Sequence, residues 1–170
     1  MHFKFLSLFA ALLLLGACAT EPETTQETTS EGEMVTEQVE ETVTTTEMVG
    51  PEAGSQEDLA VEVGDRVFFA FDSSDLDDEA RATVQKLAAW MNENPAVTLT
   101  IEGYCDERGT REYNLALGER RANAARDYLV ALGINPSRLS TISFGKERPA
   151  VMGSNEYAWA QNRRDFFSVN

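Results

Sequence analysis

The chain has 170 residues, a quarter of them charged, and a formal net charge of −15. Residues 19–58 alone carry a charge of −12, whereas residues 59–170 carry only −4. No basic stripe is present, which argues against nucleic acid as a partner. The single histidine, His2, lies in the N-terminal leader and leaves no histidine for catalysis or metal binding in the rest of the chain. We therefore expect no enzyme and no metal or cofactor site.

The N-terminus is typical of an export signal. Lys4 precedes an apolar run of 11 residues, FLSLFAALLLL, which is shorter than the about 20 residues that span a bilayer. The following residues LGAC resemble a bacterial lipobox, which predicts cleavage of residues 1–17 and lipidation of Cys18. An ordinary cleavage site that happens to contain a cysteine is the alternative. Because Ala19 rather than aspartate follows the cysteine, the resemblance implies sorting to the outer membrane.

Residues 18–58 are predicted to be a lipid-anchored, disordered linker. The segment is rich in Glu and Thr and contains no aromatic residue, so it lacks the apolar surface needed to offset the entropy lost on ordering. Repulsion between its acidic side chains extends it further. We interpret it as a tether that lets a folded domain reach away from a membrane.

Residues 59–170 are predicted to form one domain. Its strands and helices occur in the order strand, helix, strand, helix, strand, strand, which predicts a two-layer α+β domain with the helices on one face of a mixed sheet. Alternation in the second strand puts Thr98, Thr100 and Glu102 on the wetter face. The expected elements are Arg66–Phe71, Asp77–Asn94, Val97–Gly103, Glu112–Leu132, Leu139–Phe144 and Asp165–Val169.

Helical spacing identifies the faces and ends of the two helices. The first has apolar residues at steps of three and four and is expected to be capped by Ser74 or Asp75. The second presents small residues that let the helix lie close to the sheet. Its expected inner face consists of Leu115, Gly118, Ala122, Ala125, Leu129 and Leu132.

The segment IEGYCDERGTREYNLALGERRA contains the candidate site. Asp106 follows the second strand, and Arg121 lies 15 residues later in the second helix. A carboxylate and a guanidinium that face each other can hold a zwitterion, with the acid on its ammonium and the arginine on its carboxylate. Asp106 as an ordinary turn residue, and Arg121 as half of a solvated pair with Arg120, are the alternatives. The loop GYCDERGT lacks the glycine pattern of phosphate-binding loops.

Cys105 is the only cysteine besides Cys18. With Cys18 lipidated, no disulfide forms within one chain. We expect Cys105 to serve as a small buried apolar group. An intermolecular disulfide or a reactive thiol is the alternative.

Residues from about 68 to 165 resemble the OmpA-like peptidoglycan-binding domain family. The family pattern N-x-x-L-x-x-x-R-A is matched by Asn114, Leu117, Arg121 and Ala122. The closing Asn-Arg-Arg of the family is matched by Asn162, Arg163 and Arg164. The segments DERGTREYN, LGERRAN and FGKERPAV, together with the lipobox, resemble the lipid-anchored branch of the family. The expected fold is therefore the OmpA-like βαβαββ arrangement.

The resemblance implies a ligand, the diaminopimelate residue of the peptidoglycan stem peptide, bound without a covalent bond. In this family the residues equivalent to Asp106 and Arg121 hold its amine and carboxylate. The loop at Phe71 and Asp72 contributes backbone groups, and Leu117 lines the pocket. The resemblance also implies supporting roles: Asn114 would fix the loop against the helix, and the closing motif would order nearby loops, with surface solvation as the alternative reading of Arg163 and Arg164.

The chain departs from the family pattern at one place. Tyr104 and Cys105 replace the His-Ala or His-Thr that usually precedes the binding acid, so a planar ring remains but a titratable nitrogen is lost. The resemblance further implies anchoring in the outer membrane, with the domain in the periplasm, and periplasmic proteins of the Tol system as partners. A domain that serves mainly as a docking module for those proteins is the alternative function.

Overall fold

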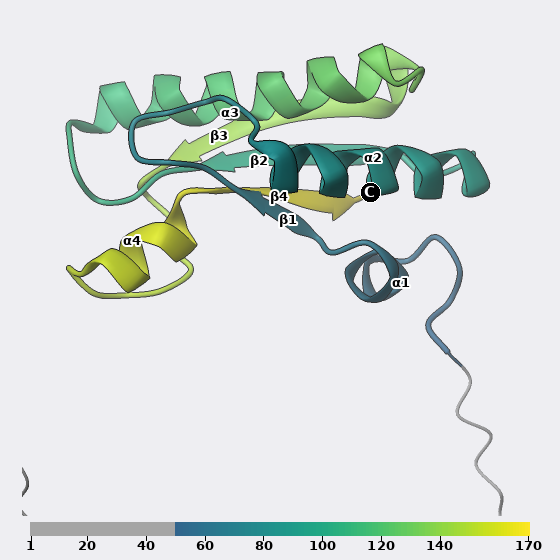
Figure 1. Cartoon of the computed structure of the whole chain (residues 1–170), viewed down its shortest axis with the longest axis horizontal. Helices are drawn as coiled ribbons and strands as arrows, with labels where there is room; N and C mark the ends of the chain where they lie inside the picture. The colour runs from purple at the N-terminus through teal and green to yellow at the C-terminus, as the bar shows by residue number, and fades with distance from the viewer. Residues whose placement is uncertain (1–49) are drawn as a thin grey trace, which may run out of the picture. The chain divides into compact units, whose positions relative to one another are not determined.

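The computed structural model describes residues 50–170. The expected signal peptide, Cys18 and residues 19–49 of the expected linker lie outside the described residues. Each strand and helix expected from the sequence is present, and two short helices occur in addition (Figure 1). The elements are α1 (Gln56–Glu62), β1 (Arg66–Phe68), α2 (Asp78–Glu93), β2 (Leu99–Tyr104), α3 (Arg111–Ala131), the 3₁₀ turn η1 (Pro136–Arg138), β3 (Leu139–Gly145), α4 (Glu156–Asn162) and β4 (Arg164–Val169).

The four strands form one mixed sheet in the order β1-β4-β2-β3. Strands β2 and β3 are parallel and are joined through α3, whereas β4 pairs antiparallel with β1 on one side and with β2 on the other. The last strand in the chain is therefore a central strand. This confirms the predicted two-layer α+β fold with a mixed sheet.

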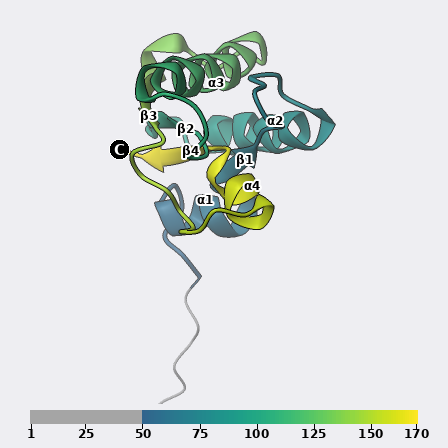
Figure 2. The same ribbon diagram turned by 90° about the vertical axis from the view of Figure 1, so that its left-hand side faces the viewer.

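Helices α2 and α3 pack side by side over one face of the sheet, while α1 and α4 lie at the β1–β4 side, away from α3 (Figures 1 and 2). The core between the two long helices and the sheet is fully apolar at its centre. Its completely buried side chains include Val84, Leu87, Met91, Leu99, Ile101, Leu129 and Phe167. As expected, Thr100 and Glu102 lie on the more exposed face of β2. Within residues 50–170, no helix combines the length and apolar composition needed to cross a bilayer.

Several local predictions were wrong. The α2 cap is Asp77, whose side chain accepts a hydrogen bond from the Ala80 amide, rather than Ser74 or Asp75. On α3, the expected inner residues Leu115 and Leu132 are exposed. Their places are taken by residues that the apolar pattern did not select, namely Asn114, Leu117 and Arg121.

The helices α1 and α4 were not expected. Each has seven residues, too few to show a clear apolar period. α1 buries only Leu59, and it begins at Gln56 inside the segment that was expected to be linker. The boundary predicted between residues 58 and 59 therefore falls within a helix.

Two glycines set the distance between α3 and β2. A Cβ atom at Gly103 would lie 1.9 Å from the backbone oxygen of Gly118, and one at Gly118 would lie 2.4 Å from the hydroxyl of Ser143. Neither contact is sterically possible, so the helix approaches the sheet as closely as it does only because both side chains are absent. This confirms that small residues let α3 lie close to the sheet.

We predict that Gly103→Ala destabilises the domain by about 2 kcal/mol or more, because the new methyl group meets helix backbone that cannot rotate away. Urea unfolding of the variant should show a lower midpoint at an unchanged slope. Gly50→Ala, where an added Cβ would meet nothing, is the matched control. Equal midpoints for the two variants would contradict the close packing.

Candidate functional site

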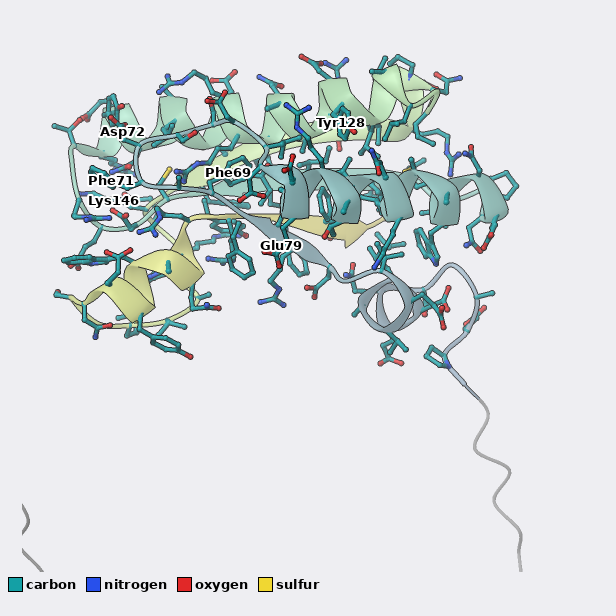
Figure 3. The ribbon with its side chains drawn as sticks, in the orientation of Figure 1. Phe69, Phe71, Asp72, Glu79, Tyr128 and Lys146 are labelled. Atoms are coloured by element: carbon teal, nitrogen blue, oxygen red, sulfur yellow. The ribbon has the colours of Figure 1, made fainter. Side chains whose placement is uncertain are left out.

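A pocket of about 140 Å³ opens at the end of the molecule where α3 begins. It is built from the loop between β1 and α2, the loop after β2, the first half of α3, and the residue before β4. Figure 3 shows Phe71 and Asp72 at this end of the molecule. The pocket is smaller than the roughly 300–1,000 Å³ sites of drug-sized ligands, so it suits one end of a small molecule. Its lining residues are Phe71, Asp72, Cys105, Asp106, Arg108, Gly109, Tyr113, Asn114, Leu117, Arg121 and Arg163.

Arg121 is completely buried and donates to three carbonyls in two segments of backbone. Its Nε donates to the Ser73 carbonyl at 2.7 Å, its Nη1 to the Tyr104 carbonyl at 2.8 Å, and its Nη2 to the Ala70 carbonyl at 3.2 Å. Burial lowers the pKa of this guanidinium. A guanidinium has five N–H donors, and one hydrogen on Nη2 has no acceptor among residues 50–170. Arg121 therefore holds the β1–α2 loop against the end of β2 and retains one donor for a ligand.

Asp106 is also buried, lines the same pocket and is paired with two arginines. It accepts from Arg108 Nη2 at 2.6 Å and from Arg163 Nη1 at 3.5 Å. Burial by itself would raise the pKa of its carboxyl, but the hydrogen bonds from Arg108, and to a lesser extent from Arg163, bring the pKa below its ordinary value. Asp106 is therefore ionised at neutral pH.

Arg163 connects Asp106 to the neighbouring segments. Its Nε donates to the Phe69 carbonyl at 3.0 Å, and its Nη2 pairs with Glu156 of α4 at 2.8 Å. Since its side chain is only 10% exposed, it is a fixed cation of the pocket wall. The expectation that this arginine orders nearby loops agrees with these contacts.

The two residues of the expected clamp share one pocket, but they do not bond to each other. Asp106 is occupied by Arg108 and Arg163, and Arg121 is occupied by backbone carbonyls. The same pocket is also lined by Phe71, Asp72, Leu117 and Asn114, which were expected at the site. Their roles toward a ligand remain predictions.

The loop that carries Asp106 is held by its neighbours. Asn114 Nδ2 donates to the carbonyls of Arg108 and Thr110 at 2.8 and 3.1 Å, which fixes the loop against α3 as expected. Asp72 has a left-handed backbone with φ of 55°, and its carboxylate accepts a hydrogen bond from the Tyr113 hydroxyl. This contact links the β1–α2 loop to α3 across the mouth of the pocket.

Three expected supporting residues lie outside the pocket lining. Tyr104 stacks on Phe144 and donates to Glu102, and Arg164 lies over the Tyr104 ring at 4.0 Å. Asn162 accepts from the amides of Ala150 and Val151. Tyr104 and Arg164 thus belong to the wetter face of the sheet, and Asn162 orders the loop before α4.

Sequence reasoning did not assign Arg108, Gly109 and Tyr113 to the pocket wall, which they line. Arg108 lies two positions after Asp106 in a tight loop, a spacing that lets its side chain fold back onto the acid. That spacing was the available signal. Tyr113 lies in the first turn of α3, and no pattern in the sequence indicated that it would line the pocket.

Cys105 has the environment expected of a small buried group. It is 3% exposed, and its thiol donates to the Asn114 carbonyl at 3.3 Å. Burial raises the pKa of the thiol to about 11, against the opposing charge of Arg121. A thiol of this kind is a poor nucleophile at neutral pH, which favours the packing role.

Asp165 is a buried carboxyl group near Arg121. It is fully buried in β4, and neither carboxyl oxygen has a hydrogen-bond partner among residues 50–170. Burial raises the pKa of this carboxyl well above its ordinary value, while Arg121 opposes the shift. The folded protein therefore binds the Asp165 proton more tightly than the unfolded chain does.

This difference predicts a pH-dependent stability. As pH rises above 3.8, the ordinary pKa of the group, the unfolded chain loses the proton first, so folded stability falls. Asp165→Asn should remove this loss and raise Tm at pH 7 by roughly 4 °C or more, the effect of about 1 kcal/mol in a domain of this size. Thermal unfolding from pH 3 to 8 measures it, and the gain should vanish near pH 3. A less stable variant at pH 7 would instead indicate an ionised carboxylate that stabilises Arg121.

The part of the chain seen in the structure, residues 50–170, contains no cluster of metal-ligating side chains. A buried acid, three arginines and exposed aromatic rings around a small pocket are suited to holding a small charged group.

Comparison with known proteins identifies the class. The profile of the OmpA family matches residues 68–163, and the chain belongs to this family. A peptidoglycan-associated lipoprotein of Rhizobium meliloti is 53% identical over 111 residues, which cover 65% of this chain and 63% of the relative. One of Brucella melitensis is 51% identical over 117 residues, covering 69% and 70%. The match thus spans less than two thirds of the Rhizobium protein's length. Both relatives are named as lipoproteins rather than as enzymes, which agrees with the prediction of a non-enzyme.

Solved structures agree with the fold. The crystal structure of the peptidoglycan-associated lipoprotein from Burkholderia pseudomallei superimposes with a TM-score of 0.61 at 42% identity, covering 62% of this chain and 90% of that one. The C-terminal domain of Helicobacter pylori MotB superimposes with a TM-score of 0.59 at 19% identity, covering 62% and 84%. The second likeness concerns the fold alone.

Proposed function

We propose that this chain binds peptidoglycan without a covalent bond and links the cell wall to the outer membrane. The observation that carries the proposal is the pocket that Asp106 and Arg121 line together, in a chain whose relatives are named for association with peptidoglycan. The ligand in this proposal is the free end of diaminopimelate in the stem peptide. Its ammonium binds Asp106, and its carboxylate binds the free Nη2 hydrogen of Arg121.

The pocket chemistry supports a zwitterionic ligand over a simple anion. Three guanidinium groups, those of Arg108, Arg121 and Arg163, line the pocket beside a single buried carboxylate, that of Asp106. A ligand with only a positive charge would be repelled by these guanidinium groups, and a ligand with only a negative charge would be repelled by Asp106. A group with both charges pairs with each.

The remaining parts of the proposal concern the N-terminal region. Residues 1–17 act as a lipoprotein signal peptide, Cys18 carries the lipid, the residues between Cys18 and α1 act chiefly as a tether, and the domain that begins with α1 is the binding domain. Stable anchoring needs more than one acyl chain, which the lipidated cysteine would provide. The protein would then sit on the periplasmic side of the outer membrane.

We predict that Asp106→Ala weakens binding to purified diaminopimelate-type peptidoglycan by roughly ten- to hundredfold, the cost of leaving a buried ammonium unpaired. Co-sedimentation of the full chain with the polymer measures this. Asp127→Ala removes an exposed acid of α3 and is the charge-matched control. Undiminished sedimentation of the Asp106 variant, with its fold intact by thermal unfolding, would reject the site.

A second function, docking of Tol-system proteins, is favoured by the rim of the pocket. Phe71 is 60% exposed and Tyr113 is 45% exposed, and aromatic side chains of this kind are common at the centres of protein interfaces. If the partner covers this rim, it shares the site with peptidoglycan.

Competition separates a shared surface from two surfaces. With a shared surface, free diaminopimelate should raise the apparent Kd for a purified Tol-system partner in proportion to its concentration. Phe71→Ala should weaken partner binding by roughly tenfold or more, as for a central aromatic contact. Partner binding that is indifferent to saturating diaminopimelate would place the partner on another surface.

A further inference from the structure

Arg108 occupies the position that the ligand's ammonium needs. Its Nε and Nη2 donate to the two carboxylate oxygens of Asp106 at 3.1 and 2.6 Å. Its guanidinium lies 4.0 Å from the ring centre of Phe71 and 4.2 Å from that of Trp159. The side chain is thus a cation held between two aromatic rings and seated on the acid of the pocket.

The acceptor capacity of Asp106 is full in this arrangement. A carboxylate offers about four lone-pair positions. One oxygen accepts from the backbone N–H and the Nε of Arg108, and the other accepts from Arg108 Nη2 and Arg163 Nη1. An incoming ammonium can be accepted only when one of these donors leaves.

Arg108 is the donor that can leave. Its side chain is 32% exposed, and Asp106 is its only hydrogen-bond acceptor among residues 50–170. The side chain of Arg163 is 10% exposed and is also bonded to the Phe69 carbonyl and to Glu156. Rotation of Arg108 breaks its side-chain hydrogen bonds to one residue, Asp106, and its contacts with the rings of Phe71 and Trp159. Rotation of Arg163 would break hydrogen bonds to three separate segments.

We propose that Arg108 is a specificity-determining residue, an internal cation that a ligand must displace from Asp106 in order to bind. This inference rests on the proposed function and refines its ligand class. The site accepts molecules that bring a primary ammonium to replace the guanidinium. It rejects carboxylates that lack an amine, because these leave the pair between Asp106 and Arg108 closed.

Calorimetric titration of the full chain with free meso-diaminopimelate tests the displacement. Arg108→Gln keeps a polar side chain but removes the competing cation, so it should bind the ligand about fivefold more tightly, a gain in the range expected for a partly exposed ion pair. Arg108→Lys keeps a cation and should stay within about twofold of wild type. Arg126→Gln removes an exposed cation elsewhere on α3 and controls for net charge. Pimelate, which has both carboxylates and no amine, should not bind the wild type.

Trp159 gives a second measurement on the wild-type protein. Its emission, taken as the difference between wild type and Trp159→Phe, should change on saturation with diaminopimelate because Arg108 leaves the ring. The same titration of Arg108→Gln should show a much smaller change.

The outcomes separate this inference from the proposed function. Diaminopimelate binding by wild type together with equal or weaker binding by a folded Arg108→Gln variant overturns the displacement and leaves the proposed function intact. Unchanged Trp159 emission when the wild type is saturated with diaminopimelate also overturns the displacement and leaves the proposed function intact. Absence of any diaminopimelate binding by wild type overturns both.

Discussion

The buried guanidinium of Arg121 is the contact on which the site depends. Its donors reach the carbonyls of Ala70, Ser73 and Tyr104, which belong to segments far apart in the sequence. The Ala70 carbonyl also accepts from the Ser73 amide at 3.3 Å, so Arg121 is its second donor. Because these acceptors are neutral carbonyl groups, they do not cancel the positive charge of Arg121. Arg121 therefore both holds the segments of the site together and contributes a positive charge to the pocket.

The pocket is arranged around one carboxylate with an excess of guanidinium groups. Arg163 is fixed by contacts to other segments, whereas Arg108 is held by Asp106 and two aromatic rings. Arg163 is thus a fixed part of the pocket wall, whereas the Arg108 side chain can move away from Asp106. This division explains how an acid can be satisfied in the free protein and still be available to a ligand.

Sequence analysis predicted the order of the main elements, the fold and the gathering of Asp106, Arg121, Phe71, Asp72, Asn114 and Leu117. It failed on the inner face of α3, where Leu115 was chosen over Leu117. That face buries Asn114, Gly118 and Arg121. Apolar residues therefore do not recur regularly in the part of α3 that lines the pocket. The two-residue spacing of Asp106 and Arg108 was an available signal that the sequence analysis did not use, whereas the second partner, Arg163, lies 57 residues from Asp106 and gave no local signal. Helices α1 and α4 were too short to produce a pattern.

The central position of β4 has a consequence for biogenesis. Because β1 and β2 do not pair with each other and both pair with residues 164–169, the sheet cannot close until that final segment is available. A nascent chain that lacks it exposes two unsatisfied strand edges and leaves the place of Phe167 in the core unfilled. Folding is therefore postponed until nearly the whole domain has been synthesised.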